Sequence, residues 1–336
     1  MYKVLLIIGV SLMLITGCGN RQNEMQLVIL KGEVFGTYYT VSYYDKKGTN
    51  YAPEIESFFD SFNESLSYYV PNSVISKINR NETNEADEYF LSVLEKSLAI
   101  AEKTNGAFDP TMSPLVNAWG FGFENRQKMD QQKIDSMMRI TGYDKVSIEG
   151  NRVIKKIPEI QFDFNAIAKG YASDLAGKIL EEKGVETYMV ELGGDLVAKG
   201  LKPDGSKWRI GLEKPAEDMY AQQEWEYLVK ITNQALATSG SYRKYYEEGD
   251  QRFSHTIDPK TGRPVKHNLL SASVFANTCL EADAYATAFM VMGLEKATEF
   301  VENRDDLMAF FIFSNPDGEY DSRMVGDMDI IPRSEL

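Results

Sequence analysis

The stretch EADAYATAFMVMG, residues 281–293, has the composition of a buried helix but carries a carboxylate. Asp283 and Thr287 stand four residues apart, so a helix places both side chains on one face. A carboxylate in such surroundings needs a partner, because burying an unpaired charge is costly. Two interpretations are open. Asp283 caps or hydrogen-bonds the start of the helix, or it joins Thr287 in offering two hard oxygen ligands to Mg²⁺.

The segments around this helix predict an α+β fold, because strands and helices cluster separately along the chain instead of alternating as in a doubly wound sheet. Apolar periodicity predicts helices over 53–66, 86–103 and from about 167 to 183. Alternating β-branched and aromatic residues predict strands within 28–45 and at 187–191, 207–213, 226–232, 269–276 and 307–313. There is no internal repeat or low-complexity linker, and the length of 336 residues by itself favours about two domains.

Composition and charge limit the kinds of molecule that the protein is expected to bind. The chain is 43% hydrophobic and 26% charged, which is ordinary for a soluble globular protein. Its formal net charge is −14, and removal of residues 1–17 with Lys3 gives −14 − 1 = −15. Nucleic acid is excluded as an expected partner, since phosphate binding needs a basic surface. An anionic ligand needs local cations or a metal.

The N-terminus has the features of a targeting segment. Lys3 precedes the apolar run VLLIIGVSLMLIT, which is too short to span a bilayer and is typical of a signal peptide. The residues ITGC, ending at Cys18, resemble a bacterial lipobox and imply cleavage before Cys18 and lipidation of its thiol. The lipid would hold the protein on a bacterial membrane, facing the periplasm or cell exterior. A plain secretory signal is the alternative.

Three segments follow from this interpretation: a lipoprotein signal peptide over 1–17, a lipidated cysteine with a polar tether over 18–27, and a folded domain over 28–336. Only one other cysteine occurs, Cys279, which then has no partner within the chain. The fold must therefore rest on its core and not on disulfides. Next to an apolar helix, Cys279 is expected to be a small buried residue and not a nucleophile.

Three further motifs offer groups for catalysis or binding. In ELGGDL, residues 191–196, adjacent glycines form a tight turn or let a flat ligand lie against bare backbone. In DFNAIAKGYASD, residues 163–174, Lys169 lies in the first turns of a helix, where it either faces solvent or adds a charge for a phosphate. In HTIDPKTGRPV, residues 255–265, His255 near Asp258 is either structural or a base or orienting group. With His267 as the only other histidine, a histidine-rich zinc site is excluded.

Eight motifs in order resemble the ApbE family of FAD:protein FMN transferases: GTYYTV, SYYVPNSVISKIN, TNGAFDPTMSPLVNAWGFG, DFNAIAKGYASD, ELGGDL, ATSGSYRKYY, HTIDPKTGRPV and EADAYATAFMVMG. The resemblance extends from about Gly36 to Gly293. It implies a single α+β catalytic domain, ApbE-like and T-fold-like, with two lobes and an FAD cleft between them. Residues 28–336 then form one flavin transferase domain, which replaces the expectation of two domains.

The resemblance also implies roles for individual residues. The metal ligands fall on Asp283, Thr287 and the backbone carbonyl of Ala166. His255 is the implied base, with Lys169 and Asp258 as further catalytic groups. One departure is visible, because Phe35 stands where the family commonly has methionine, so we expect it to stack differently on the flavin. The implied FAD-binding positions are Phe35, Tyr69, Ala107, Phe108, Asp109, Asp163, Lys169, Glu191, Gly193, Gly194 and Ile257.

The function implied by the resemblance is Mg²⁺-dependent transfer of FMN from FAD to a Thr or Ser hydroxyl of an exported protein through a phosphoester, with release of AMP. Implied acceptors carry a flavinylation motif and include subunits of sodium-pumping NADH:quinone reductase or Rnf-type complexes. A second enzymatic hypothesis is an Mg²⁺-dependent FAD pyrophosphatase that yields FMN and AMP. A hypothesis without catalysis is a flavin-binding lipoprotein.

Overall fold

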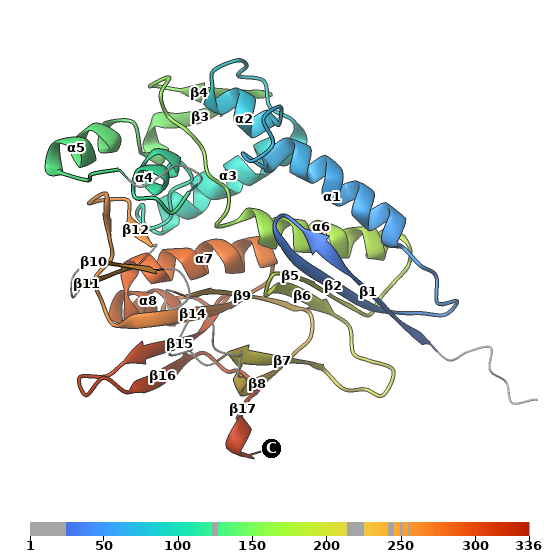
Figure 1. Cartoon of the computed structure of the whole chain (residues 1–336). Coiled ribbons are helices and arrows are strands. Elements are labelled where there is room, and N and C mark those ends of the chain that lie inside the picture. Colours follow the sequence, from blue (N-terminus) through green and yellow to red (C-terminus); the bar gives the residue numbers. More distant parts are fainter. Residues whose placement is uncertain are drawn as a thin grey trace, which may run out of the picture.

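The computed structural model describes residues 25–122, 127–213, 225–240, 245–248, 251–254 and 256–335; for 245–248 and 251–254 it describes the backbone alone. Its centre is an eight-stranded sheet in the order β1-β2-β5-β6-β9-β14-β15-β16, in which every neighbouring pair is antiparallel. Helices gather on one face of this sheet and a small sheet on the other (Figure 1). The predicted α+β class is confirmed.

The strands of the central sheet come from both halves of the chain. They are β1 (Gln26–Val34), β2 (Thr37–Asp45), β5 (Tyr188–Leu192), β6 (Asp195–Lys199), β9 (Gln234–Gly240), β14 (Leu269–Ala276), β15 (Met308–Ser314) and β16 (Tyr320–Val325). Smaller sheets pair β3 (Val146–Glu149) with β4 (Arg152–Lys155), β10 (Tyr245–Glu248) with β11 (Gln251–Ser254), and β12 (Ile257–Asp258) with β13 (Arg263–Pro264).

Two helices lie directly on the central sheet. α6 (Ala168–Glu182) packs on β5 and β6, α7 (Cys279–Met292) packs on β9 and β14, and the two helices contact each other. α7 is the helix predicted from residues 281–293, and it ends at Gly293 with φ 77°. α8 (Leu294–Glu302) follows it and packs on α7 and β15. The sheet therefore supports the two helices that carry the predicted metal ligands.

A second layer of helices covers α6 and α7 (Figure 1). α1 packs against α6, and α3 packs against α7. In α3 the side chain of Asp87 accepts a hydrogen bond from the N–H of Phe90, and the buried residues recur on one face as the periodicity predicted. The helices of this layer are α1 (Ala52–Leu66), α2 (Val74–Asn79), α3 (Glu88–Lys103), α4 (Ser113–Ala118) and α5 (Gln131–Arg139).

The opposite face of the central sheet carries a second core. A three-stranded sheet of β7 (Trp208–Glu213), β8 (Trp225–Ile231) and β17 (Ile330–Pro332) covers it. Alternation along β14 serves both cores, since Val274 faces the helices and Phe275 faces the small sheet. Because one sheet contributes to both cores, the chain forms a single domain, and the expectation of two domains from length alone is wrong.

The interpretations of the N-terminal segment remain predictions. The signal peptide and Cys18 lie outside the described residues. β1 begins at Gln26, two residues before the predicted domain start, because the strand alternation continues into the segment predicted as a tether. Within the described part of the chain, no helix has both the length and the apolar character needed to cross a bilayer.

Candidate active site

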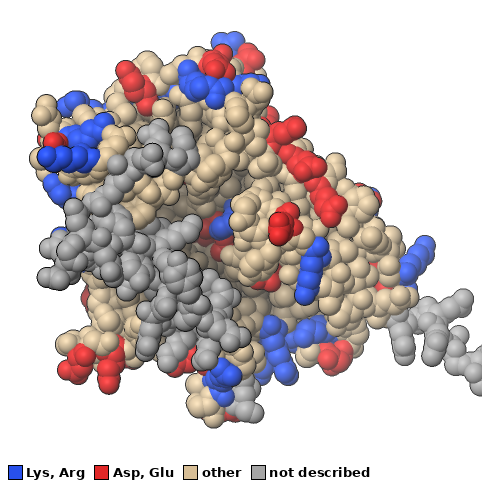
Figure 2. Space-filling model, viewed as in Figure 1, with Lys and Arg blue, Asp and Glu red and all other residues tan. Residues whose placement is uncertain are grey.

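A cavity of about 730 Å³ opens between the outer helices and the central sheet. Its walls come from the loop before α4, from the start of α6, from the turn between β5 and β6, and from β9 and α7. Figure 2 shows the molecule hollowed here, with basic and acidic side chains inside the hollow. This size suits a large organic ligand.

The close crossing of α6 and α7 brings the charged residues of the cavity together. The N–H of Gly170 donates to Asp283 Oδ2 at 3.2 Å, and Lys169 Nζ lies 3.6 Å from the same oxygen. A Cβ at position 170 would lie 2.2 Å from the carbonyl oxygen of Cys279, so only glycine permits this approach. The N-cap of α7 is Thr278, so Asp283 does not cap its own helix.

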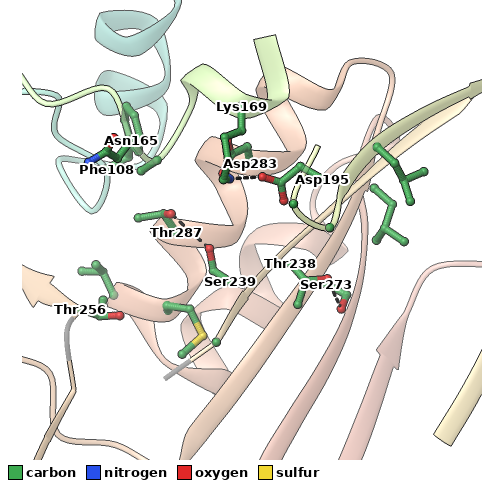
Figure 3. A pocket seen from close by; sticks show the side chains of 18 of the residues that line it. Phe108, Asn165, Lys169, Asp195, Thr238, Ser239, Thr256, Ser273, Asp283 and Thr287 are labelled. Atoms are coloured by element: carbon green, nitrogen blue, oxygen red, sulfur yellow. Dashed lines mark hydrogen bonds and ion pairs between the residues drawn. The ribbon is translucent and has the colours of Figure 1, made fainter. Parts of the chain in front are cut away.

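Lys169 lies between two carboxylates in the cavity. Its Nζ donates to Asp195 Oδ2, as Figure 3 shows, and Asp283 is its second partner. Burial alone would lower the pKa of Lys169, but Asp195 and Asp283 outweigh burial and raise it. Burial raises the pKa of Asp283, the charge of Asp195 adds to this shift, and Lys169 opposes it. Lys169 is therefore a charged member of the site, and the alternative of a fully solvated lysine is wrong.

The predicted metal ligands share one wall of the cavity. Ala166, Asp283 and Thr287 all line it, and Thr287 Oγ1 lies 3.2 Å from Ser239 Oγ on β9 (Figure 3). Among the described residues, the polar contacts of Asp283 all use Oδ2, which leaves Oδ1 for a ligand. A carboxylate, a hydroxyl and a backbone carbonyl are the hard oxygen donors that Mg²⁺ prefers, so these residues fit the implied ion.

Most of the predicted FAD-binding residues line the same cavity. They come from four separate segments of the chain, which the fold brings together. Those lining it are Ala107, Phe108, Asp109, Asp163, Lys169, Glu191, Gly193, Gly194 and Ile257.

Asp109 accepts three hydrogen bonds from the protein. Its Oδ1 accepts hydrogen bonds from Thr111 N at 2.8 Å and Thr111 Oγ1 at 2.6 Å, and its Oδ2 accepts one from Tyr143 N at 3.0 Å. Burial raises the pKa of Asp109, and the bonds from Thr111 and Tyr143 oppose that shift. Asp109 therefore holds the AFD loop in the shape that lines the cavity.

The two glycines of ELGGDL form a tight turn that is also a wall of the cavity. Gly193 and Gly194 have φ values of 57° and 96°, and a Cβ at Gly193 would lie 2.8 Å from Thr37 Oγ1. The predicted tight turn is therefore present, and a flat ligand lying against its backbone stays a prediction. Next to the turn, Glu191 accepts a hydrogen bond from Tyr38 at 3.4 Å, and burial raises its pKa.

Asp163, at the start of DFNAIAKGYASD, sits at the edge of the cavity beside a half-exposed aromatic pair. Burial raises its pKa to about 6, and the N–H of Asn165, which donates to Oδ1 at 2.8 Å, opposes the shift. Tyr69 is 64% exposed, and its ring lies 4.4 Å from that of Tyr68. Tyr69 is not among the described residues that line the cavity, and its flavin contact stays a prediction.

Two other residues predicted for the site, Phe35 and Asp258, make contacts within the fold. Phe35 has φ 53° in the turn after β1, and its ring packs 5.7 Å from that of Phe59 and 5.5 Å from that of Phe62 on α1. Asp258 accepts a hydrogen bond from Lys260 N at 2.8 Å and so shapes the DPKTG turn. Neither belongs to the described lining of the cavity.

His255, the predicted base, lies outside the described residues, so its role stays a prediction. Its neighbours Thr256 and Ile257 line the cavity.

Sequence reasoning missed several polar residues of the cavity. Asp195, the last acid of ELGGDL, was assigned no role, although an acid on a strand directly after two glycines was a signal for it. The motif ATSGSYRKYY supplied no site residue, yet Thr238 and Ser239 line the cavity, and Thr238 Oγ1 lies 2.8 Å from Ser273 Oγ. These hydroxyls lie together only because the strands pair in the folded sheet, and local sequence pattern does not predict which strands pair.

Comparison with known families gives this site its context. The family model described as "ApbE family" matches residues 35–311, well over half of the chain. The chain belongs to the ApbE family. The resemblance predicted from eight ordered motifs is thereby confirmed.

Curated relatives of this ApbE-family chain carry one name. An FAD:protein FMN transferase of Vibrio cholerae is 36% identical over 317 residues, which are 92% of this chain and 93% of the relative. The FAD:protein FMN transferase of Escherichia coli strain K12 is 35% identical over 309 residues, 88% and 87% of the two chains.

Solved structures agree with the ApbE-family fold. The flavin transferase ApbE from Vibrio cholerae superimposes with a TM-score of 0.80 at 34% identity, covering 90% of this chain and 98% of that one. The apo form of the Pseudomonas stutzeri flavinyl transferase ApbE also gives a TM-score of 0.80, at 32% identity and with 90% and 95% covered.

Proposed function

We propose that this chain is an FAD:protein FMN transferase, which attaches FMN from FAD to a Thr or Ser hydroxyl of another protein and releases AMP. The observation that carries the proposal is the convergence of Ala166, Lys169, Asp283 and Thr287 on one cavity wall. The transferase class of the relatives supports it, since they align over most of both chains.

The reaction exchanges the phosphoanhydride bond of FAD for a phosphoester bond to the acceptor. The acceptor oxygen forms a bond to the phosphorus of the FMN half of FAD, and the bond from that phosphorus to the AMP phosphate breaks. The acceptor proton passes to a base, for which His255 is our candidate, and the electron pair leaves with AMP. A positioned base typically contributes about 10² to 10⁴ in rate.

Magnesium fits this site and is part of the proposal. Asp283, Thr287 and the carbonyl of Ala166 would hold the ion, and its charge would neutralise the pyrophosphate as the leaving group departs. Lys169, held between Asp195 and Asp283, keeps a positive charge beside the ligand oxygens in a cavity with several carboxylates. These residues thereby limit repulsion between the acidic wall and an anionic substrate.

We also propose where the enzyme works and on what. The lipobox-like sequence at Cys18 supports a lipid anchor on a bacterial membrane, with the domain facing the periplasm or cell exterior. Family analogy favours exported flavoproteins that carry a flavinylation motif, such as subunits of sodium-pumping NADH:quinone reductase or Rnf-type complexes.

The test is to incubate the protein lacking residues 1–18 with FAD, Mg²⁺ and an acceptor fragment bearing a flavinylation motif, and to weigh the acceptor by mass spectrometry. We expect a mass gain equal to FMN minus water, equimolar AMP, and loss of both with EDTA. FMN and AMP without modified acceptor would establish a pyrophosphatase instead. FAD retained with no AMP would establish a flavin-binding protein.

A further inference from the structure

The start of α7 is completed by a residue of the neighbouring helix. Asp174 lies on α6, and its Oδ1 and Oδ2 accept hydrogen bonds from Cys279 N at 2.8 Å and Leu280 N at 2.9 Å. The first N–H groups of a helix have no partners within it. The N-cap Thr278 accepts from Glu281 N at 3.3 Å, so Asp174 serves the first two N–H groups.

A second link between the helices lies one turn away. The N–H of Gly170, four residues before Asp174, donates to Asp283 Oδ2, and Asp283 is four residues after Cys279. The helices thus run antiparallel past each other and are joined at two points separated by one turn, about 6 Å along the axis. Two such links fix both the axial position and the rotation of α7 against α6.

This register decides whether the predicted metal ligands meet. Ala166 precedes α6, whereas Asp283 and Thr287 lie on α7, so one helix cannot supply the whole set. Ions of the size of Mg²⁺ demand near-ideal ligand distances. A displacement of α7 by even part of a residue step would separate the carboxylate from the carbonyl.

We propose that Asp174 is a positioning residue of the cation site, acting through the N-terminus of α7 to hold Asp283 and Thr287 opposite Ala166. This inference rests on the metal-dependent part of the proposed function. Asp174 is not among the described residues that line the cavity. Its effect should therefore appear as weaker cation binding, beyond any loss of stability.

The chain offers a matched control in another helix. Asp87 caps α3, where its Oδ1 accepts from Phe90 N at 2.9 Å and from Ser65 Oγ at 2.7 Å. Asp174→Ala and Asp87→Ala each remove a capping carboxylate with two accepted hydrogen bonds. Only the first lies on the helix pair that carries the cation ligands.

The experiment measures Mn²⁺ binding by electron paramagnetic resonance in the purified protein lacking residues 1–18, and thermal unfolding in EDTA. We expect Asp174→Ala to weaken Mn²⁺ binding by about 10- to 100-fold, as for other residues that orient metal ligands. Asp87→Ala should leave binding within about twofold, although both variants unfold at lower temperature. Asp174→Asn, which keeps one acceptor oxygen, should fall between and serves if the alanine variant does not fold.

Unchanged Mn²⁺ binding in folded Asp174→Ala, or an equal loss in Asp87→Ala, would overturn the inference. Absence of Mn²⁺ binding in the unsubstituted protein would overturn it as well. Normal Mn²⁺ binding without FMN transfer would instead remove the proposed function and leave the positioning role of Asp174 intact.

Discussion

The buried helices α3 and α7 show two ways to build a helix into one core. α3 has 16 residues, begins at its own cap Asp87 and buries one face. α7 has 14 residues, is buried on nearly all sides and, besides its own cap Thr278, donates its first two N–H groups to Asp174 on another helix. α3 therefore contributes mainly to packing, whereas α7 is placed by its neighbours.

The polar residues that line the site differ from the other buried polar residues of the two helices. Among the buried side-chain groups that the structure describes, the hydroxyls of Ser97 on α3 and Tyr285 on α7 have no hydrogen-bond partner. On α7, Asp283 and Thr287 each have a partner in the cavity wall. A buried carboxylate lowers stability unless it is compensated, so its presence on α7 indicates that the helix serves the site.

The largest effect is expected from Asp283→Ala on α7. Loss of the carboxylate removes the only acidic ligand of the predicted ion, so FMN transfer should fall at least about 10²-fold. The free energy of unfolding in EDTA should fall by about 1–3 kcal/mol, because the buried N–H of Gly170 loses its acceptor and Lys169 loses one of its two carboxylates. Acceptor mass spectrometry and urea unfolding measure the two quantities, and near-normal transfer at ordinary Mg²⁺ would refute the metal assignment.

The opposite pattern is expected from Phe90→Ala on α3. Phe90 is fully buried against Phe162 and Phe164, with ring centroids 5.5 Å and 5.1 Å away. Its removal should lower the free energy of unfolding by about 3–5 kcal/mol. Mn²⁺ affinity of the protein that remains folded should not change. If Mn²⁺ affinity fell together with stability, the inference that α3 serves packing and α7 serves the cation site would be wrong.

A smaller effect should distinguish the hydroxyl of Ser239 from that of Ser97. Ser239→Ala removes the hydrogen-bond partner of Thr287. Because one hydrogen bond contributes about 0.5–1.5 kcal/mol, we expect Mn²⁺ binding to weaken by roughly 2- to 10-fold. Ser97→Ala on α3 is the control. It removes a hydroxyl that has no partner, so stability should be equal or higher and binding unchanged. Calorimetric titration with Mn²⁺ distinguishes the variants.

The last prediction concerns pH. Burial raises the pKa of Asp174 to about 7; the N–H groups of Leu280 and Cys279 and the charge of Lys178 oppose this shift, while Glu281 adds to it. In the unfolded chain the pKa is about 3.9. The folded state therefore binds this proton more tightly, and the stability it contributes is complete below about pH 4 and is lost as pH rises through about 7.

Urea unfolding in EDTA from pH 5 to pH 8 tests this sign. The stability of the unsubstituted protein relative to Asp174→Asn should decline with rising pH, by at most about 1.4 kcal/mol per pH unit for one proton. Parallel profiles for the two proteins would show that Asp174 does not titrate in this range.

Local pattern in the sequence predicted the four longest helices and several strands, but it predicted neither β6 and β9 nor the way in which the elements pack against one another. The spacing within 281–293 predicted α7 and put Asp283 and Thr287 on one face, as found. It gave no sign of Asp174, because the match between Asp174 and the start of α7 depends on how two distant helices cross. Asp195 was missed for the same reason, since its pairing with Lys169 spans 26 residues and two kinds of element.

The close approach of α6 and α7 at Gly170 also affects the order in which the chain folds. The bond between Gly170 and Asp283 joins positions 113 residues apart, so no shorter fragment holds both halves of the predicted cation site. If the predicted ion binds there, it stabilises only the completed fold, by about 2.7 kcal/mol when its concentration is 100 times the dissociation constant. A newly made chain would gain this stabilisation only after its last helices have docked, and chelation would remove it.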